Sequence, residues 1–260
     1  MSVLEIKRLL KKHFLYYNSN WDKLTLDQIE KKFKHEHGGY YRDVSKYEKT
    51  LKGKYRKKGK REYPKIKNVT VNCSKVKALH IPSIAWNDKP TQKRYIKRGN
   101  DLLLKYFSNT DTITIDLNYN WGGKATIMAA ALSPIFNLSK RTRLTFCKLR
   151  NSKIKADLIR VKPGCYKTNA NPTIQGTTKS LKKLKNINVL MGETFSAGEM
   201  IAIAFKSMAD QFNITFIGSK TGGSTTSVKY FKLKHDDGIS MPIGYMTDSN
   251  GIVYKKGVPI

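Results

Sequence analysis

Apolar residues recur along the chain at two different spacings, and the spacing changes near residue 76. In residues 1–34 they recur at the three-to-four-residue spacing of an amphipathic helix, which predicts two short helices. Asp22 and Thr25 are of the residue types that begin helices. We therefore expect a helical region over residues 1–37. Its apolar positions are Leu4, Ile6, Leu9, Leu10, Leu24, Ile29 and Phe33.

Residues 38–75 differ from this helical region because they are rich in Gly and Lys and contain few aliphatic side chains. A segment of this composition has little apolar surface to bury. We expect it to form a basic flap or cap with little core of its own. Its most basic part is KGKYRKKGKR, residues 52–61.

From residue 76 onward, short strand-like apolar runs alternate with longer helix-like runs. This alternation predicts an α/β architecture with crossover connections. The strand-like runs are ALHIPSIAW, TITIDL, LTFCKL, INVLM and ITFIG. The helix-like runs are TQKRYIKRGNDLLLKYF, KATIMAAALSPIF and GEMIAIAFKSMADQF. Near the end of the chain, VKYFKLK and GISMPIGYMT predict a hairpin, and SNGIVYKKGVPI predicts another.

The composition is that of a folded but strongly basic protein. Hydrophobic residues make up 39% of the 260 residues, enough for a buried core. The net charge of +31 attracts any polyanion, so it does not choose among partners. Because charge alone is no signature of a nucleic-acid-binding fold, we expect no specific nucleic-acid binding. A weak attraction to an anionic membrane surface is compatible with the charge.

The sequence contains no pattern typical of a cofactor site. The three cysteines have no metal-like spacing, and no glycine pattern of a nucleotide site occurs in its expected context, so we expect neither metal nor cofactor. Lys and Arg interrupt the apolar residues of the N-terminus, which lacks a signal-peptide core or a membrane span. This predicts a cytoplasmic protein; the alternative, if an N-terminal anchor is missing, is the outer face of the membrane.

Two strand-to-helix loops carry residues with catalytic chemistry. In IDLNYNWGGKATIM, Gly122 and Gly123 follow a strand, and paired glycines can turn backbone N–H groups toward a ligand. The structural alternative is a tight turn. In GETFSAGEM, Ser196 stands where a helix begins, as either a helix cap or a nucleophile. Because both loops follow strands of one predicted sheet, we expect them to face each other at its edge.

Four motifs in order resemble those of the tail-specific, or C-terminal-processing, serine peptidases. They are IDLNYNWGG for the family's strand and Asn-x-Gly-Gly, ETFSAGEM for its Thr-x-Ser-x-x-Glu, IGSKTGG for its Ile-Gly-x-x-Thr-x-Gly, and GVPI for its closing Gly-Val. In the second motif, Thr194 and Glu199 occupy positions that shape the turn. The resemblance implies that residues 76–260 are the catalytic core, a crotonase- and Clp-protease-like spiral of ββα units.

The resemblance also implies a chemical role for residues of both loops. Ser196 would attack a peptide carbonyl. The backbone N–H of Ala197, with one from Gly122 or Gly123, would stabilise the oxyanion that forms.

A serine nucleophile needs a base, and the sequence departs here from one branch of the family. The processing branch has a Lys directly after Thr-x-Gly, where this chain has Ser224, and Lys220 lies four residues too early. The nisin-resistance branch instead uses a His from the N-terminal part of the chain. The segment KHEHGGYY resembles that region and favours His37 as the base, with His35 as the alternative.

The sequence therefore predicts a serine peptidase with a Ser-His dyad, Ser196 and His37. Its substrate would be a peptide cleaved near the C-terminus and bound in extended form along a sheet edge. Cleavage of a bacteriocin, as in nisin resistance, is the most specific form of this prediction. The alternative is a non-catalytic module that binds peptides or polyanions and retains the peptidase fold.

Overall fold

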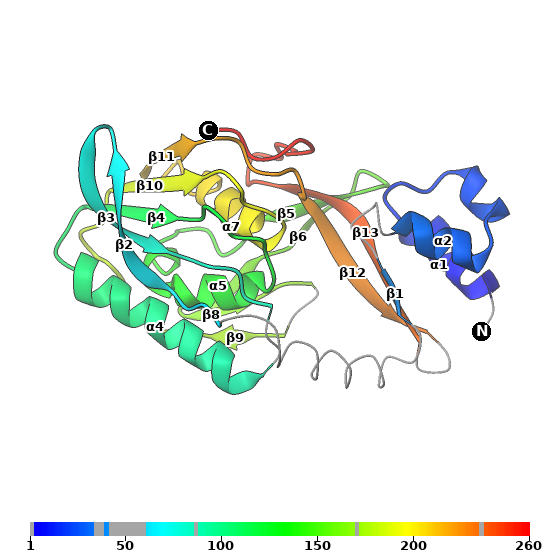
Figure 1. Ribbon diagram of the computed structural model, residues 1–260, viewed down its shortest axis with the longest axis horizontal. Helices are drawn as coiled ribbons and strands as arrows, with labels where there is room; N and C mark the ends of the chain where they lie inside the picture. The colour runs from blue at the N-terminus through cyan, green and yellow to red at the C-terminus, as the bar shows by residue number, and fades with distance from the viewer. Residues whose placement is uncertain (1–2, 34–38, 42–60, 86–87, 170–171, 234–236) are drawn as a thin grey trace. The chain divides into compact units, whose positions relative to one another are not determined.

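The computed structural model describes residues 3–33, 39–41, 61–85, 88–169, 172–233 and 237–260 (Figure 1). The chain divides into two compact units. The first contains Met1–Lys60, Cys147–Lys155 and Thr226–Tyr245. The second contains Arg61–Phe146, Ala156–Thr225 and Met246–Ile260. About half of the predicted basic flap, residues 38–75, lies outside the described residues, and the boundaries at residues 38 and 76 stay a prediction.

The first unit begins with the two helices that the apolar spacing predicts, joined by a short 3-10 helix. Thr25 begins the second helix as predicted: its N–H donates to Gln28 Oε1 at 2.8 Å, and its Oγ1 accepts from the Gln28 N–H at 3.3 Å. The apolar faces of these helices, with Trp21, pack against residues of the hairpin near the end of the chain. The helices are α1 (Val3–His13), η1 (Ser19–Lys23) and α2 (Leu26–Phe33).

The predicted hairpin is present as an antiparallel pair within a five-stranded sheet. The strands of this sheet are β1 (Gly39–Tyr41), β5 (Phe146–Leu149), β6 (Ile154–Ala156), β12 (Thr226–Lys232) and β13 (Gly238–Thr247).

The prediction of a second hairpin at residues 249–260 is wrong. This segment forms one isolated antiparallel bridge, between Val253 and Thr247, instead of a pair of strands. The terminal segment bonds to the loop after β11 instead: the Val258 N–H donates to Thr221 Oγ1 at 2.7 Å.

The second unit is built on a largely parallel sheet with strand order β11-β10-β4-β3-β2 (Figure 1). The pairs β3–β4, β4–β10 and β10–β11 are parallel, and β2–β3 is an antiparallel hairpin. The predicted α/β architecture with crossover connections is confirmed. The strands are β2 (Lys65–Val71), β3 (Ser74–His80), β4 (Thr112–Asp116), β10 (Asn186–Met191) and β11 (Asn213–Gly218).

Residues from this sheet and from four helices form one hydrophobic core, and the residues of each strand alternate between the two faces of the sheet. In β4, Ile113 and Ile115 belong to the core, whereas Thr114 and Asp116 point to the opposite face. All seven residues of α5 are buried, because the helix packs against its neighbours α4, α6 and α7. The helices are α4 (Lys89–Phe107), α5 (Ala125–Ala131), α6 (Ser133–Phe136) and α7 (Ala197–Lys206).

A small antiparallel sheet in the second unit was not predicted from the sequence. Its strands have two to four residues each, too short for an apolar period to emerge. They are β7 (Ile159–Lys162), β8 (Cys165–Lys167) and β9 (Ile174–Gln175).

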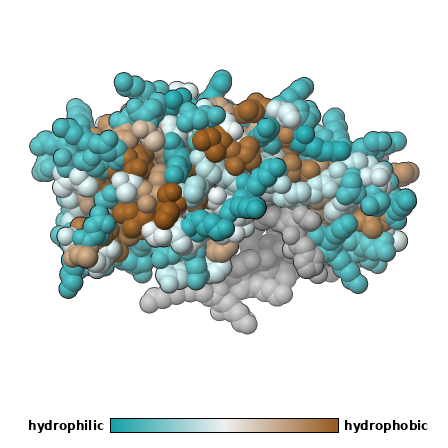
Figure 2. Space-filling view, turned by 90° about the horizontal axis from the view of Figure 1, so that it is seen from above, coloured by the Kyte–Doolittle hydropathy of each residue, from teal (hydrophilic) through white to brown (hydrophobic). Residues whose placement is uncertain are grey.

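Figure 2 shows one face on which hydrophilic residues predominate, with smaller hydrophobic patches between them. In the part of the chain that the structure describes, no helix has the length and apolar character needed to cross a membrane.

Candidate active site

The two loops with catalytic residues follow neighbouring parallel strands of the second unit. The loop 117–124 follows β4, and the loop 192–196 follows β10. Residues of these strands pair in register from Asn186↔Thr112 to Leu190↔Asp116, so both strands end at the same edge. This edge is where open α/β sheets bind ligands.

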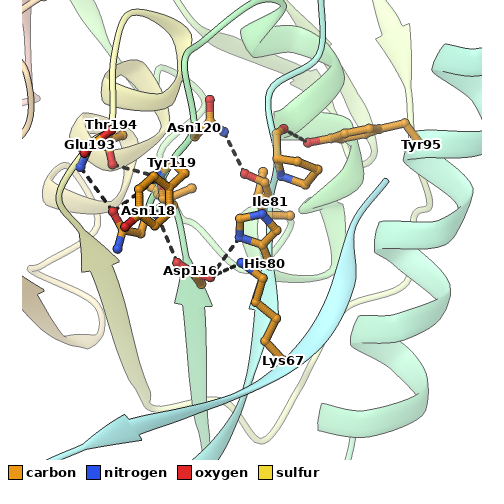
Figure 3. Close-up of polar contacts among 12 residues, drawn as sticks. Lys67, His80, Ile81, Tyr95, Asp116, Asn118, Tyr119, Asn120, Glu193 and Thr194 are labelled. Atoms are coloured by element: carbon orange, nitrogen blue, oxygen red, sulfur yellow. Dashed lines mark hydrogen bonds and ion pairs between the residues drawn. The ribbon is translucent and has the colours of Figure 1, made fainter. Parts of the chain in front are cut away.

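The loops are tied together by side chains, which fixes their relative position (Figure 3). The Thr194 hydroxyl is fully buried and donates to the Leu117 carbonyl at 2.8 Å. The Glu193 N–H donates to Asn118 Oδ1 at 3.2 Å. The Thr194 side chain therefore links the loop before α7 to the end of β4.

Ser196 lies on a strained turn directly before α7. Its backbone angles, a φ of 52° and a ψ of −114°, are unusual for a residue that has a Cβ. An ordinary N-cap residue has extended backbone angles, so a cap alone does not explain this conformation. Strain of this kind persists where the surrounding structure enforces it, and it is common at active sites.

Gly122 makes close contact with the Ser196 turn. A Cβ placed on Gly122 would lie 2.8 Å from the Ser196 Cβ, and the glycine has a φ of 93°. Both facts restrict this position to glycine. The Gly122 N–H donates to Asn120 Oδ1 at 2.9 Å, and Asn120 Nδ2 donates to the Ile81 carbonyl at 2.8 Å. The Gly122 N–H is therefore already engaged.

Gly123 presents its backbone differently. It forms a parallel bridge with Ile84 through its two neighbours: the Ile84 N–H donates to the Gly122 carbonyl, and the Lys124 N–H donates to the Ile84 carbonyl. In such a bridge the central residue directs its own N–H away from the partner. The N–H of Ala197 is also directed out of its helix, as the first donor of α7.

Glu199 is completely buried and accepts hydrogen bonds from three parts of the site. Oε2 accepts from the Ser196 N–H at 2.9 Å. Oε1 accepts from the Thr221 hydroxyl at 2.5 Å and the Gly223 N–H at 2.8 Å. Burial raises the pKa of the Glu199 carboxyl above its ordinary value, and these donors offset part of that effect. Glu199 thus joins the Ser196 turn to the loop after β11.

The predicted base cannot be described, because His35 and His37 lie outside the described residues. Lys220 is exposed in the loop after β11, and Ser224 is partly buried. Among the described residues, no group of three or more His, Cys, Asp and Glu side chains could hold a metal ion.

A buried histidine-carboxylate pair was missed by the sequence analysis (Figure 3). His80 Nδ1 lies 2.8 Å from Asp116 Oδ2, and Lys67 Nζ lies 3.2 Å from the same oxygen. Burial alone would raise the pKa of Asp116, but the hydrogen bond and charge of His80 and the charge of Lys67 outweigh it, so the pKa lies below its ordinary value. The sequence signal for this pair was one polar residue in each of two apolar strand-like runs, His80 in ALHIPSIAW and Asp116 in TITIDL.

A model of peptidase family S41 matches residues 75–259 of the chain. The chain belongs to this family. Membership in S41 supports a serine peptidase of the tail-specific type, and it implies a peptide or protein substrate. The family predicted from the four motifs is confirmed.

Comparison with solved structures shows that the S41 chain shares its fold with two bacterial proteins. A lipoprotein from Streptococcus agalactiae matches with a TM-score of 0.66 and 18% identity, over 99% of this chain and 87% of that chain. A putative peptidase from Parabacteroides merdae matches with a TM-score of 0.52 and 12% identity, over 97% of this chain and 85% of that chain. A search of curated proteins found no match.

Proposed function

We propose that this S41 peptidase hydrolyses peptide bonds with Ser196 as its nucleophile. The observation that carries the proposal is the strained backbone of Ser196 at the start of α7, in close contact with Gly122. A sharp turn between a strand and a helix exposes the serine hydroxyl to the substrate, and acyl transfer requires an accessible nucleophile. Thr194 and Glu199 support the turn from two sides.

The oxyanion of the tetrahedral intermediate is stabilised by two backbone donors, the N–H groups of Ala197 and Gly123. Gly122 was the alternative to Gly123. Its N–H is engaged by the Asn120 side chain, which favours Gly123. Gly122 contributes by allowing the two loops to approach each other.

The base is His37, with His35 as the alternative. An imidazole takes up a proton near neutral pH without a large environmental shift. His80 is a poorer candidate although it has a carboxylate partner. Leu79 and Ile81, the residues on either side of His80 in the chain, belong to the core that contains α7, so the His80 side chain points to the opposite face of the sheet.

The more specific predictions from the motifs, on the fold, the cleavage position and the location, are part of this proposal. The core is a spiral of ββα units with a basic flap, and the dyad cleaves peptides near their C-terminus, as in the nisin-resistance branch. The solved neighbour described as a lipoprotein supports the outer face of a membrane over the cytoplasm. The net charge of +31 supports a weak attraction to an anionic surface.

One set of variants tests the nucleophile. If Ser196 served only as a cap, Ser196→Ala would cost about 1 kcal/mol of stability, and Ser196→Asn would retain activity. We expect both variants to stay folded and to lose peptide hydrolysis by several orders of magnitude, together with labelling by a fluorophosphonate probe. Hydrolysis by either folded variant would remove Ser196 from the mechanism.

A second set tests the base. We expect His37→Ala to abolish hydrolysis and Lys220→Ala to leave it unchanged, with His35→Ala and His80→Gln as comparisons. Loss of hydrolysis in Lys220→Ala but not in His37→Ala would favour a Ser-Lys mechanism. A wild-type protein that binds peptides but neither hydrolyses them nor reacts with the probe would be the non-catalytic module.

A further inference from the structure

Two aromatic rings stack on each other beside the proposed nucleophile. The ring centroids of Trp121 and Phe195 are 4.9 Å apart, and the ring planes differ by 6°. Each aromatic residue directly precedes a residue of the site. Trp121 precedes Gly122, and Phe195 precedes Ser196, whose Cβ is in close contact with Gly122. The stack therefore bridges the two loops next to the Ser196 side chain.

The stack is held in place by the backbone around it. A Cβ placed on Gly222 would lie 1.9 Å from Phe195 Cε1, so the phenyl ring lies directly against the Gly222 backbone. The Gly222 N–H donates to the Thr194 carbonyl at 2.9 Å. On the other side, the Trp121 N–H donates to Ser83 Oγ at 2.6 Å. A surface fixed in this way loses little conformational entropy when it binds a ligand.

The indole is open to solvent although it belongs to this fixed stack. Trp121 is 61% exposed, whereas Phe195 is partly buried. A rigid, exposed tryptophan is the kind of residue that supplies binding energy at an interface, because it offers a large apolar area at low entropic cost. Its position beside Ser196 limits the ligand to the part of the substrate near the bond that is cleaved.

The charge around the stack identifies the class of side chain that it accepts. Aromatic faces bind either apolar groups or cations. The charged residues of four nearby loops, 118–124, 192–196, 219–225 and 255–257, comprise four lysines and one glutamate, and the loop 81–88, which bonds to Trp121, adds Asp88. This positive surplus disfavours a cationic side chain, which leaves the apolar one of the two kinds of group that an aromatic face binds. The residues are Lys124, Glu193, Lys220, Lys255 and Lys256.

We propose that the Trp121–Phe195 stack binds a large apolar side chain of the peptide substrate next to the scissile bond and so determines specificity. The inference rests on the proposed function, because it takes Ser196 as the position of the scissile bond.

The test compares Trp121→Ala and Trp121→Phe with the wild-type protein on quenched fluorescent peptides. The peptides share one sequence, and each residue flanking the cleavage site is varied among Phe, Leu, Ala, Lys and Asp. We expect the wild type to prefer Phe or Leu at one of these positions. Trp121→Ala should lose about tenfold in kcat/KM for that peptide and change little for the Ala peptide. Trp121→Phe should keep most of the preference, because it keeps an aromatic face.

The matched control is Tyr119→Asn, at a residue of the same loop that is 59% exposed and has a φ of 60°. Asn tolerates this backbone conformation, and the variant should keep the wild-type preference. Thermal melting establishes that each variant is folded. A fluorophosphonate probe, which does not need the stack, should label Trp121→Ala as fast as wild type.

Binding gives a readout that does not depend on hydrolysis. In Ser196→Ala, the Phe peptide should bind more tightly than the Ala peptide, and Trp121→Ala in that background should remove the difference. If Trp121→Ala keeps the wild-type preference in hydrolysis or in binding, the inference about the stack is wrong and the peptidase proposal survives. If the wild type neither hydrolyses peptides nor reacts with the probe, the proposed function fails, and the binding comparison alone decides the role of the stack.

Discussion

Asp116 and Glu199 are two buried carboxylates of one unit whose pKa values shift in opposite directions. Asp116 is 3% exposed and Glu199 is 0% exposed, so burial disfavours the charge of both. Their hydrogen-bond partners differ. Asp116 lies against His80 and Lys67, which carry or can carry a positive charge, whereas Glu199 accepts from a hydroxyl and backbone N–H groups, which are neutral.

The comparison shows that neutral hydrogen-bond donors orient a buried carboxylate without fully compensating its charge. Burial raises the pKa of Glu199 despite its several hydrogen bonds. Cationic neighbours reverse the balance for Asp116 and lower its pKa. The two groups accordingly serve different purposes. Glu199 accepts a hydrogen bond from the turn of Ser196, and Asp116 links the end of β4 to β3 on the opposite face of the sheet.

The largest effect on stability is expected for Asp116→Asn. The amide keeps the shape of the carboxylate but leaves Lys67 and His80 without their anionic partner, which should lower the free energy of unfolding by about 3 kcal/mol. Urea denaturation measures this change. The control is Asp101→Asn, whose exposed pair with Lys97 contributes at most about 1 kcal/mol. An equally small loss for Asp116→Asn would mean that the ion pair does not stabilise the fold.

Glu199→Gln should have a smaller effect on stability and a clear effect on turnover. An amide NH₂ would face a backbone or hydroxyl donor, and one buried donor left unsatisfied costs about 2 kcal/mol. Because the Ser196 N–H bonds directly to Glu199, a displaced turn should lower kcat by about 100-fold. Urea denaturation and peptide hydrolysis measure the two effects. Glu193→Gln, at an exposed residue, is the control for stability, and unchanged turnover in folded Glu199→Gln would contradict the positioning role.

The smallest effect is a pH dependence of opposite sign at the two sites. The pKa of Asp116 is below its ordinary 3.8, so its stabilisation is present above that value and is lost as the pH falls through the lowered pKa. The pKa of Glu199 is above its ordinary 4.5, so the folded state gains stability relative to the unfolded state as the pH falls through the raised pKa toward 4.5. The stability difference between wild type and Asp116→Asn should therefore shrink in acid, and that between wild type and Glu199→Gln should grow. Urea denaturation across the acidic range measures both, and changes of the same sign would refute the contrast.

Much of the fold could be predicted because it depends on local patterns. The alternation of TITIDL and INVLM with helix-like runs predicted the parallel strands β4 and β10 and the helix after each. The prediction failed where local pattern was weak: β7, β8 and β9 are too short to show a period, and the terminal segment pairs with a distant loop rather than with itself.

The candidate site, too, could be predicted from the sequence only in part. The sequence by itself determined that Ser196 and Gly122–Gly123 each follow a strand and precede a helix, since motif order and strand periodicity are properties of the chain. Only the tertiary structure decided that the Gly122 N–H is taken by Asn120, that His80 meets Asp116, and that Trp121 stacks on Phe195. The physical reason is distance along the chain. His80 and Asp116 are 36 residues apart, and the loops carrying Trp121 and Phe195 follow different strands, so the folded backbone alone brings these side chains together.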